Sequence, residues 1–209
     1  MVPLSHHEVK IGIYGGTFDP IHNAHLTVAE EVRTRLELRE VLFIPAGQPL
    51  LRPSNYVSPA RHRLEMVRLA IAGKPYFKVS AMEIERPGAT FTVDTLAELK
   101  AGQYQQNELF VILGWDSFLQ LPYWREPARI IQLCVLVVVP RPGYPPPDIK
   151  RMEANLPGLS QRVMLLQQPQ MDISASEIRQ RVAQGLSISY LVPPPVEKYV
   201  REHRLYLSQ

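Results

Sequence analysis

Short, almost wholly apolar runs separated by amphipathic stretches are the feature that most limits what this 209-residue chain can fold into. Residues 41–44, 109–113 and 134–139 are runs of this kind, typical of strands that are buried on both faces. Residues 23–38 show the other pattern, because apolar side chains recur there every four positions among charged ones. Apolar strands that alternate with amphipathic helices favour a parallel sheet covered by helices on both faces.

The same two patterns place the remaining elements. The expected strands are residues 9–14, 41–44, 77–79, 109–113, 134–139 and 163–166. The expected helices are residues 23–38, a helix capped by Ser58 that includes Ile71, and residues 92–99, 116–121, 129–133, 149–156, 175–184 and 196–203. We therefore expect an α/β fold, a Rossmann-like doubly wound parallel sheet, as a single domain over residues 1–209 with a helical C-terminal part. Ligands of such sheets bind at the carboxyl ends of the strands.

Composition limits the cellular compartment and the kinds of partner that we expect. The longest apolar stretch ends at Pro140 after seven residues, whereas a membrane span needs about 18, so we expect no membrane partner. The net charge is +3, from 23 basic and 20 acidic residues that are interspersed, and this balance gives little support to nucleic-acid binding. The single cysteine, Cys134, lies in an apolar run and cannot form an internal disulfide. This fits a reducing, cytoplasmic compartment.

The stretch from Gly15 to His25 carries the strongest chemical signal. Gly15 and Gly16 follow the first expected strand, and glycines at such a turn let backbone amides approach an anion closely. His22 and His25 are three residues apart, so both rings project to one side of the first helical turn, where they can donate hydrogen bonds to phosphate. A zinc site would need a third ligand, which the neighbouring sequence does not offer, and we expect no metal held by the protein.

A second constellation begins at Asp172. Ser174 with Glu177 three residues later forms a capping box, so a helix should start here. Arg179 lies in the first turns of that helix, where its planar fork and the amino-terminal amides could hold a polyphosphate. A helix cap alone is the alternative interpretation, and the spacing does not decide between the two.

The first motif resembles the G-G-T-F-D-P-x-H-x-x-H signature of the nucleotidylyltransferase superfamily, and the second resembles its I-S-[ST]-x-x-[IL]-R helix start. Within that superfamily the chain is most similar to the bacterial nicotinate-nucleotide adenylyltransferases. Further matches are residues 43–49, 92–96, 114–117, Trp124, 138–143 and 190–193. The departures are Ala24 for glycine, 50–52 (Leu-Leu-Arg) for proline, histidine and lysine, 90–92 (Thr-Phe-Thr) for Ser-Tyr-Thr, and Ala175 for serine or threonine.

The resemblance implies a reaction in which ATP adenylylates nicotinate mononucleotide, giving deamido-NAD and pyrophosphate. It implies that the catalytic residues are His22, His25 and Arg179, that the ATP-binding residues are Gly15, Gly16, Thr17, Phe18, Gly114, Asp116, Ser174, Ser176 and Arg179, and that the acceptor-binding residues are Arg52, Thr92 and Trp124. Mg²⁺ would bind through the ATP phosphates. The sequence shows no basic side chain dedicated to the nicotinate carboxylate, so we expect backbone amides near Thr92 and Trp124 to bind it.

Besides nucleic-acid binding, which the charge balance disfavours, two alternative functions are weighed, and the oligomeric state is left open. The acceptor could be nicotinamide mononucleotide or another phosphomonoester, such as pantetheine phosphate. A non-catalytic nucleotide sensor with the same fold would be expected to lack a catalytic residue, yet His22, His25 and Arg179 are all present. A homo-oligomer is compatible with the sequence, which does not determine the oligomeric state.

Overall fold

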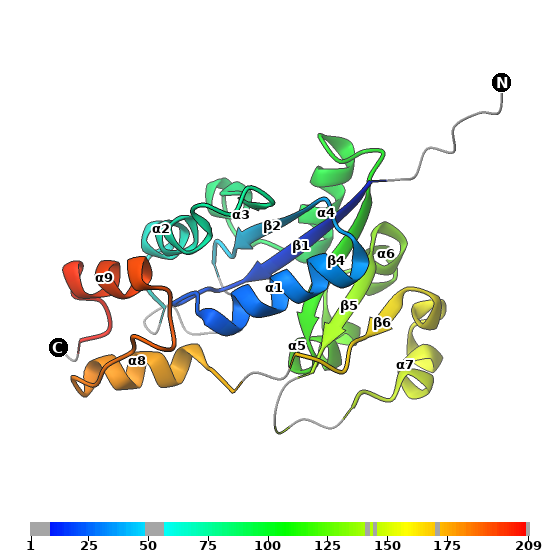
Figure 1. Ribbon diagram of the computed structural model, residues 1–209. Coiled ribbons are helices and arrows are strands. Elements are labelled where there is room, and N and C mark those ends of the chain that lie inside the picture. The colour runs from blue at the N-terminus through cyan, green and yellow to red at the C-terminus, as the bar shows by residue number, and fades with distance from the viewer. Residues whose placement is uncertain (1–8, 49–56, 141–142, 144–145, 170–171, 208–209) are drawn as a thin grey trace.

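The computed structural model describes residues 9–48, 57–140, 143, 146–169 and 172–207. Six parallel strands form one sheet in the order β3-β2-β1-β4-β5-β6 (Figure 1). The strands are β1 (Lys10–Gly16), β2 (Glu40–Pro45), β3 (Phe77–Val79), β4 (Glu108–Gly114), β5 (Val135–Val139) and β6 (Val163–Leu165). The chain builds outward from β1 in one direction and then from β4 in the other, so the predicted doubly wound parallel sheet is confirmed.

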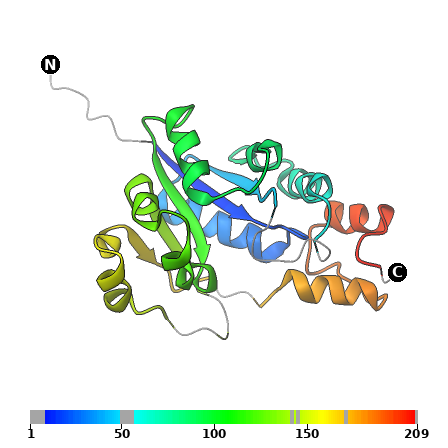
Figure 2. The same ribbon diagram turned by 180° about the vertical axis from the view of Figure 1, so that it is seen from behind.

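Helices cover both faces of this sheet. They are α1 (Asn23–Leu36), α2 (Ala60–Ile71), α3 (Met82–Glu85), α4 (Thr92–Ala101), α5 (Trp115–Leu119), α6 (Pro127–Leu133), α7 (Ile149–Asn155), α8 (Ala175–Ala183) and α9 (Pro194–Glu202), with short 3-10 turns η2 (Leu121–Tyr123) and η3 (Leu159–Gln161). Helix α1 crosses the near face of the sheet in Figure 1, and α4 and α6 lie on the opposite face, which Figure 2 brings to the front. Among the described residues, no helix has the length and apolar character needed to cross a bilayer.

Two hydrophobic cores explain why the strands are nearly all apolar. Successive side chains of a strand point to opposite faces of the sheet. In β2, Val41 and Phe43 pack into the core beneath α1, α2, α8 and α9, while Leu42 and Ile44 pack into the core beneath α4, α5, α6 and α7. Both faces of the strand are therefore buried, which removes the alternation of apolar and polar residues expected of a half-exposed strand.

The structure corrects the predicted ends of several helices, most clearly those of α1 and α2. Helix α1 stops at Leu36, short of residue 38, because Glu37 takes a left-handed conformation with φ 54° and turns Leu38 into the core. Ser58 does not cap α2, whose N-cap is Pro59 without a side-chain cap hydrogen bond. The backbone N–H of Ser58 instead donates to Asp19 at 3.0 Å, and its carbonyl accepts from Arg63 at 3.0 Å.

The helical C-terminal part packs back onto the first half of the chain. Helix α9 lies beside α2 (Figure 1), and its Val196 and Val200 are buried in the core that contains α1. His62 of α2 and the hydroxyl of Tyr199 of α9 are 3.0 Å apart. This packing brings the last described residues close to the loop that follows β1.

Candidate active site

A cleft with a volume of about 710 Å³ opens at the carboxyl ends of the central strands. Its walls come from the β1–α1 loop, the end of β4, the start of α4, the segment around η2, and the start of α8. Among the residues predicted to bind ligands, those that line it are Gly15, Gly16, Thr17, Phe18, His22, His25, Thr92, Gly114, Asp116, Trp124 and Ser174. Ser176 and Arg179 lie next to the cleft without lining it, and Arg52 lies outside the described residues.

His22 and His25 stack on each other at the start of α1. Their ring centroids are 3.7 Å apart with an interplanar angle of 28°, so the prediction that both rings lie on one side of the first turn is confirmed. The backbone N–H of His22 donates to Nδ1 of His25 at 3.2 Å. Because Nδ1 of the neutral ring is an acceptor, its proton lies on Nε2. His25 is thereby oriented to donate from Nε2.

Phe18 fixes the shape of the loop between the glycines and the histidines. Its side chain is buried and contacts the edge of the His25 ring at a centroid distance of 5.1 Å. Its backbone has φ 50°, a left-handed conformation that side-chain-bearing residues adopt rarely. Such a conformation persists only where the surrounding contacts determine it, and a tightly held loop of this kind is common at ligand sites.

A buried arginine ties this loop to two others, and sequence analysis missed it. Arg63 of α2 is only 1% exposed, and its guanidinium donates to the carbonyls of Thr17 at 2.9 Å, Gly47 at 3.0 Å and Ser58 at 3.0 Å. Burial lowers the pKa of Arg63, and the nearby Asp19 opposes that effect. The signal in the sequence was an arginine next to the buried Met66 and Val67 on the apolar face of a helix, where an unpaired charge would not be tolerated.

Asp19 connects the loop to the C-terminal part of the chain. Its carboxylate accepts from the backbone of Ser58 at 3.0 Å and from the hydroxyl of Tyr206 at 2.7 Å. Burial raises the pKa of Tyr206, as does the carboxylate of Asp19 that its hydroxyl contacts, so Tyr206 stays protonated and acts as the donor. Arg179 donates to the carbonyl of Asp19 at 2.7 Å and to the hydroxyl of Ser176 at 3.3 Å. Arg179 of α8 therefore contacts the loop that leads to the two histidines directly.

Ser174 caps α8, as the capping box predicted. Its hydroxyl accepts from the backbone N–H of Glu177 at 3.1 Å, and α8 begins at Ala175. The predicted clamp of Arg179 on phosphate is not tested by these contacts and stays a prediction.

The far end of the cleft combines aromatic rings with a half-buried carboxyl group. Phe91, Thr92 and Trp124 line this end. Glu83, which sequence analysis did not single out, accepts hydrogen bonds from Thr95 at 2.7 Å and Thr90 at 3.3 Å. Burial raises the pKa of Glu83, partly opposed by those hydrogen bonds. Among the described residues, no group of three or more His, Cys, Asp or Glu is arranged to hold a metal ion.

Comparison with known proteins identifies the family. A family model described as Cytidylyltransferase-like matches residues 13–181. The probable nicotinate-nucleotide adenylyltransferase of Dehalococcoides mccartyi is 49% identical over 201 residues, which cover 96% of this chain and 98% of that protein. The chain belongs to the nicotinate-nucleotide adenylyltransferase family. The family's protein from Thermomicrobium roseum is 45% identical, covering 94% of this chain and 91% of its own length.

Solved structures agree with the fold of this adenylyltransferase. The Plasmodium falciparum nicotinic acid mononucleotide adenylyltransferase complexed with APC has a TM-score of 0.75 at 21% identity and covers 96% of this chain and 98% of its own. The same protein complexed with NaAD has a TM-score of 0.76 at 20% identity, with coverage of 95% and 97%. At these identities the likeness establishes the fold alone. The resemblance inferred from the two motifs is confirmed by the curated relatives.

Proposed function

We propose that this adenylyltransferase transfers the adenylyl group of ATP to nicotinate mononucleotide, giving deamido-NAD and pyrophosphate. The observation that carries the proposal is the stacked pair His22 and His25 at the start of α1, which lines the same cleft as Gly15 and Gly16 at the end of β1. Relatives of 49% and 45% identity that bear the name of this activity support the choice of acceptor.

The chemistry requires alignment and charge stabilisation more than proton transfer. An oxygen of the acceptor's 5′-phosphate attacks the α-phosphorus of ATP, and the bond from that phosphorus to the oxygen bridging to the β-phosphate breaks. Pyrophosphate leaves with the electron pair of the broken bond. The attacking phosphate is ionised at neutral pH, so no general base is needed. The protein has to hold two anions in line and meet the developing charge with fixed donors.

His25 is the donor best placed for that charge. The bond from the backbone of His22 to its Nδ1 leaves the proton on Nε2, and contacts with Phe18 and Tyr14 hold the ring. A donor fixed in this way needs no reorganisation during the reaction, which is the condition for effective electrostatic stabilisation. The amino terminus of α1, a 14-residue helix, adds its positive dipole end at the same place.

We assign the remaining residues to the two substrates by their place around the cleft. The ATP side consists of Gly15, Gly16, Thr17, Phe18, Gly114, Asp116, Ser174, Ser176 and Arg179, and the acceptor side consists of Thr92 and Trp124, together with Arg52 from outside the described residues. Trp124 offers an aromatic face for the pyridine ring. Mg²⁺ would reach the site with ATP, bound through the phosphates, and would offset part of their negative charge.

A turnover assay with several acceptors tests the proposal. Pyrophosphate release is measured with ATP and either nicotinate mononucleotide, nicotinamide mononucleotide or pantetheine phosphate, with ATP alone as the control. We expect nicotinate mononucleotide to have the highest kcat/KM, by tenfold or more, because unsatisfied buried donors penalise the wrong ligand by roughly 1–3 kcal/mol each. Values within about threefold for the two pyridine nucleotides would replace the proposal with dual specificity. Preferred use of pantetheine phosphate would reject it.

We also propose a reducing, cytoplasmic setting, which the use of ATP and the state of Cys134 support. Burial raises the pKa of Cys134 to about 12, so its thiolate scarcely forms at neutral pH. A homo-oligomer stays an open alternative, which light scattering after size-exclusion chromatography would decide.

A further inference from the structure

Arg125 occupies a distinctive position at the acceptor end of the cleft. It follows Trp124 in the segment between η2 and α6, and among the cleft-lining residues that the structure describes it is the only arginine or lysine. The carbon at the centre of its guanidinium lies 4.8 Å from the centroid of the Phe91 ring. A positive group therefore lies over the Phe91 ring on the acceptor side of the cleft.

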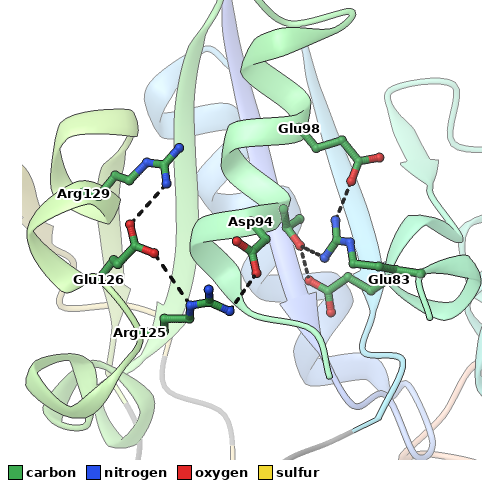
Figure 3. A network of polar contacts seen from close by, with 8 residues as sticks. Glu83, Asp94, Glu98, Arg125, Glu126 and Arg129 are labelled. Carbon is green, nitrogen blue, oxygen red and sulfur yellow. Dashed lines mark hydrogen bonds and ion pairs between the residues drawn. The ribbon is translucent and has the colours of Figure 1, made fainter. Parts of the chain in front are cut away.

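The present partners of Arg125 hold it loosely. Its nearest approaches to Asp94 and to Glu126 are both 3.6 Å, and its side chain is 51% exposed. Figure 3 shows the guanidinium between the carboxylates of Glu126 and Asp94, with a dashed line to each. Exposed ion pairs of this length contribute little to stability. Glu126 also has a closer partner in Arg129, at 3.1 Å. Arg125 can thus turn to a ligand without leaving Glu126 unpaired.

The charges around this end of the cleft make a cation necessary for an anionic ligand. The carboxyl group of Glu83 lines the cleft, and Asp94 lies in the first turn of α4, directly after Thr92 and Val93. A ligand carboxylate at this end meets the like charge of Glu83, which disfavours it unless a positive group is also present. The paired histidines serve the phosphate end. Arg125 is the group that the described cleft offers at the other end.

We propose that Arg125 binds the carboxylate of nicotinate mononucleotide and is a specificity-determining residue for this acceptor, an inference that rests on the function proposed above. A guanidinium presents parallel N–H donors that match both oxygens of a carboxylate. A carboxamide has one oxygen and one NH₂ group. Its NH₂ group would face an N–H donor of the guanidinium, so one of the two hydrogen bonds would be lost. The backbone amides at the start of α4 can add to this recognition without replacing it.

A purely structural role for Arg125 predicts something different. If the residue only braces α4 against α6 through Asp94 and Glu126, its loss would affect the two pyridine nucleotides alike. If Arg125 binds the carboxylate, its loss would lower kcat/KM for nicotinate mononucleotide and leave kcat/KM for the amide unchanged. The ratio of kcat/KM for the acid to kcat/KM for the amide therefore separates the two roles.

The experiment compares Arg125→Ala and Arg125→Lys with the wild-type enzyme and with Arg129→Ala as a matched control. Arg129 shares Glu126 with Arg125 but does not line the cleft. Pyrophosphate release is followed with ATP and each of the two nucleotides, and far-ultraviolet circular dichroism checks that each variant is folded.

We expect Arg125→Ala to lower kcat/KM for nicotinate mononucleotide by about tenfold, the effect of losing one charge-assisted contact in a half-exposed setting. The loss should appear mainly in KM for the acceptor, Arg125→Lys should restore part of it, and Arg129→Ala should keep the wild-type ratio. An unchanged ratio in Arg125→Ala, or an equal loss for both nucleotides, would overturn the inference. Absence of wild-type turnover with nicotinate mononucleotide would instead reject the proposed function, so the two failures are distinguishable.

Discussion

The buried guanidinium of Arg63 makes a quantitative test of how the cleft is held together. We consider Arg63→Met, which keeps the length of the side chain and removes its charge and donors. The substitution takes away three hydrogen bonds, to the carbonyls of Thr17, Gly47 and Ser58, with lengths of 2.9 to 3.0 Å. These carbonyls lie in the loop after β1, the loop after β2 and the turn before α2, so three separate segments lose their common anchor.

The expected cost follows from those contacts. An acceptor left without its partner costs about 1–3 kcal/mol when it is buried, and the three carbonyls belong to residues of intermediate exposure, so the lower figure applies to each. Two further effects oppose each other. Removing the desolvated charge of Arg63 recovers part of the lost free energy of unfolding, but it also takes a nearby positive charge away from the carboxylate of Asp19. We therefore expect Arg63→Met to lower the free energy of unfolding by about 3 kcal/mol, a large share of the roughly 5–15 kcal/mol typical of a folded domain.

Urea denaturation followed by circular dichroism measures this free energy. The matched control is Arg68→Met on the same helix, where the side chain is 54% exposed and forms an ion pair with Glu65 at 3.4 Å. We expect the control to change stability by less than about 0.5 kcal/mol. If Arg63→Met costs less than about 1 kcal/mol, the three carbonyls do not depend on the arginine and the argument fails.

Three further predictions concern the cleft itself. His25→Ala should lower kcat by roughly 10²- to 10³-fold with an unchanged circular dichroism spectrum, because it removes one fixed donor; a decrease within about threefold would contradict the role of His25. Arg179→Lys keeps the charge but loses the planar fork, so it should raise KM for ATP more than KM for the acceptor, and equal increases would place Arg179 elsewhere. Burial raises the pKa of Glu83 above 4.5, so the folded state binds this proton more tightly than the unfolded state. The free energy of unfolding should therefore fall as the pH rises through the interval from 4.5 to the raised value, and Glu83→Gln should remove that fall. Parallel pH dependences of the two proteins in urea denaturation would show that Glu83 does not titrate as described.

The sequence predicted the sheet well because burial on both faces leaves a strong pattern. Residues 41–44 and 134–139 were expected as strands from their unbroken apolar runs; residues 41–44 lie in β2, and 135–139 form β5 while Cys134 is the C-cap of α6. Helix α3 was missed because its four residues are too few to display a period of 3.6. The left-handed Glu37 was missed because nothing in its residue type requires that conformation. The single domain over residues 1–209 stays a prediction.

The candidate site was also predicted only in part. The residues of the β1–α1 loop were found because they are close together in sequence and follow a strand. Asp19, Arg63 and Tyr206 form a network that was missed because its members lie far apart along the chain and meet only through packing of α2 and the C-terminal part. Arg125 stood next to a predicted acceptor residue, Trp124, and that adjacency was the available signal. The sequence could not show that the segment between η2 and α6 places Arg125 in the lining of the cleft.

The hydrogen bond from Tyr206 to Asp19 has a consequence for how the enzyme matures during synthesis. It joins positions 187 residues apart. At about 5–20 residues per second, a ribosome needs roughly 10 to 40 s to pass from one position to the other. A nascent chain thus carries the glycine turn and both histidines long before the partner that holds Asp19 exists. This hydrogen bond can form only after residue 206 has been made, so shortened translation products that end before it would contain the whole β1–α1 motif with Asp19 held by Ser58 but not by Tyr206.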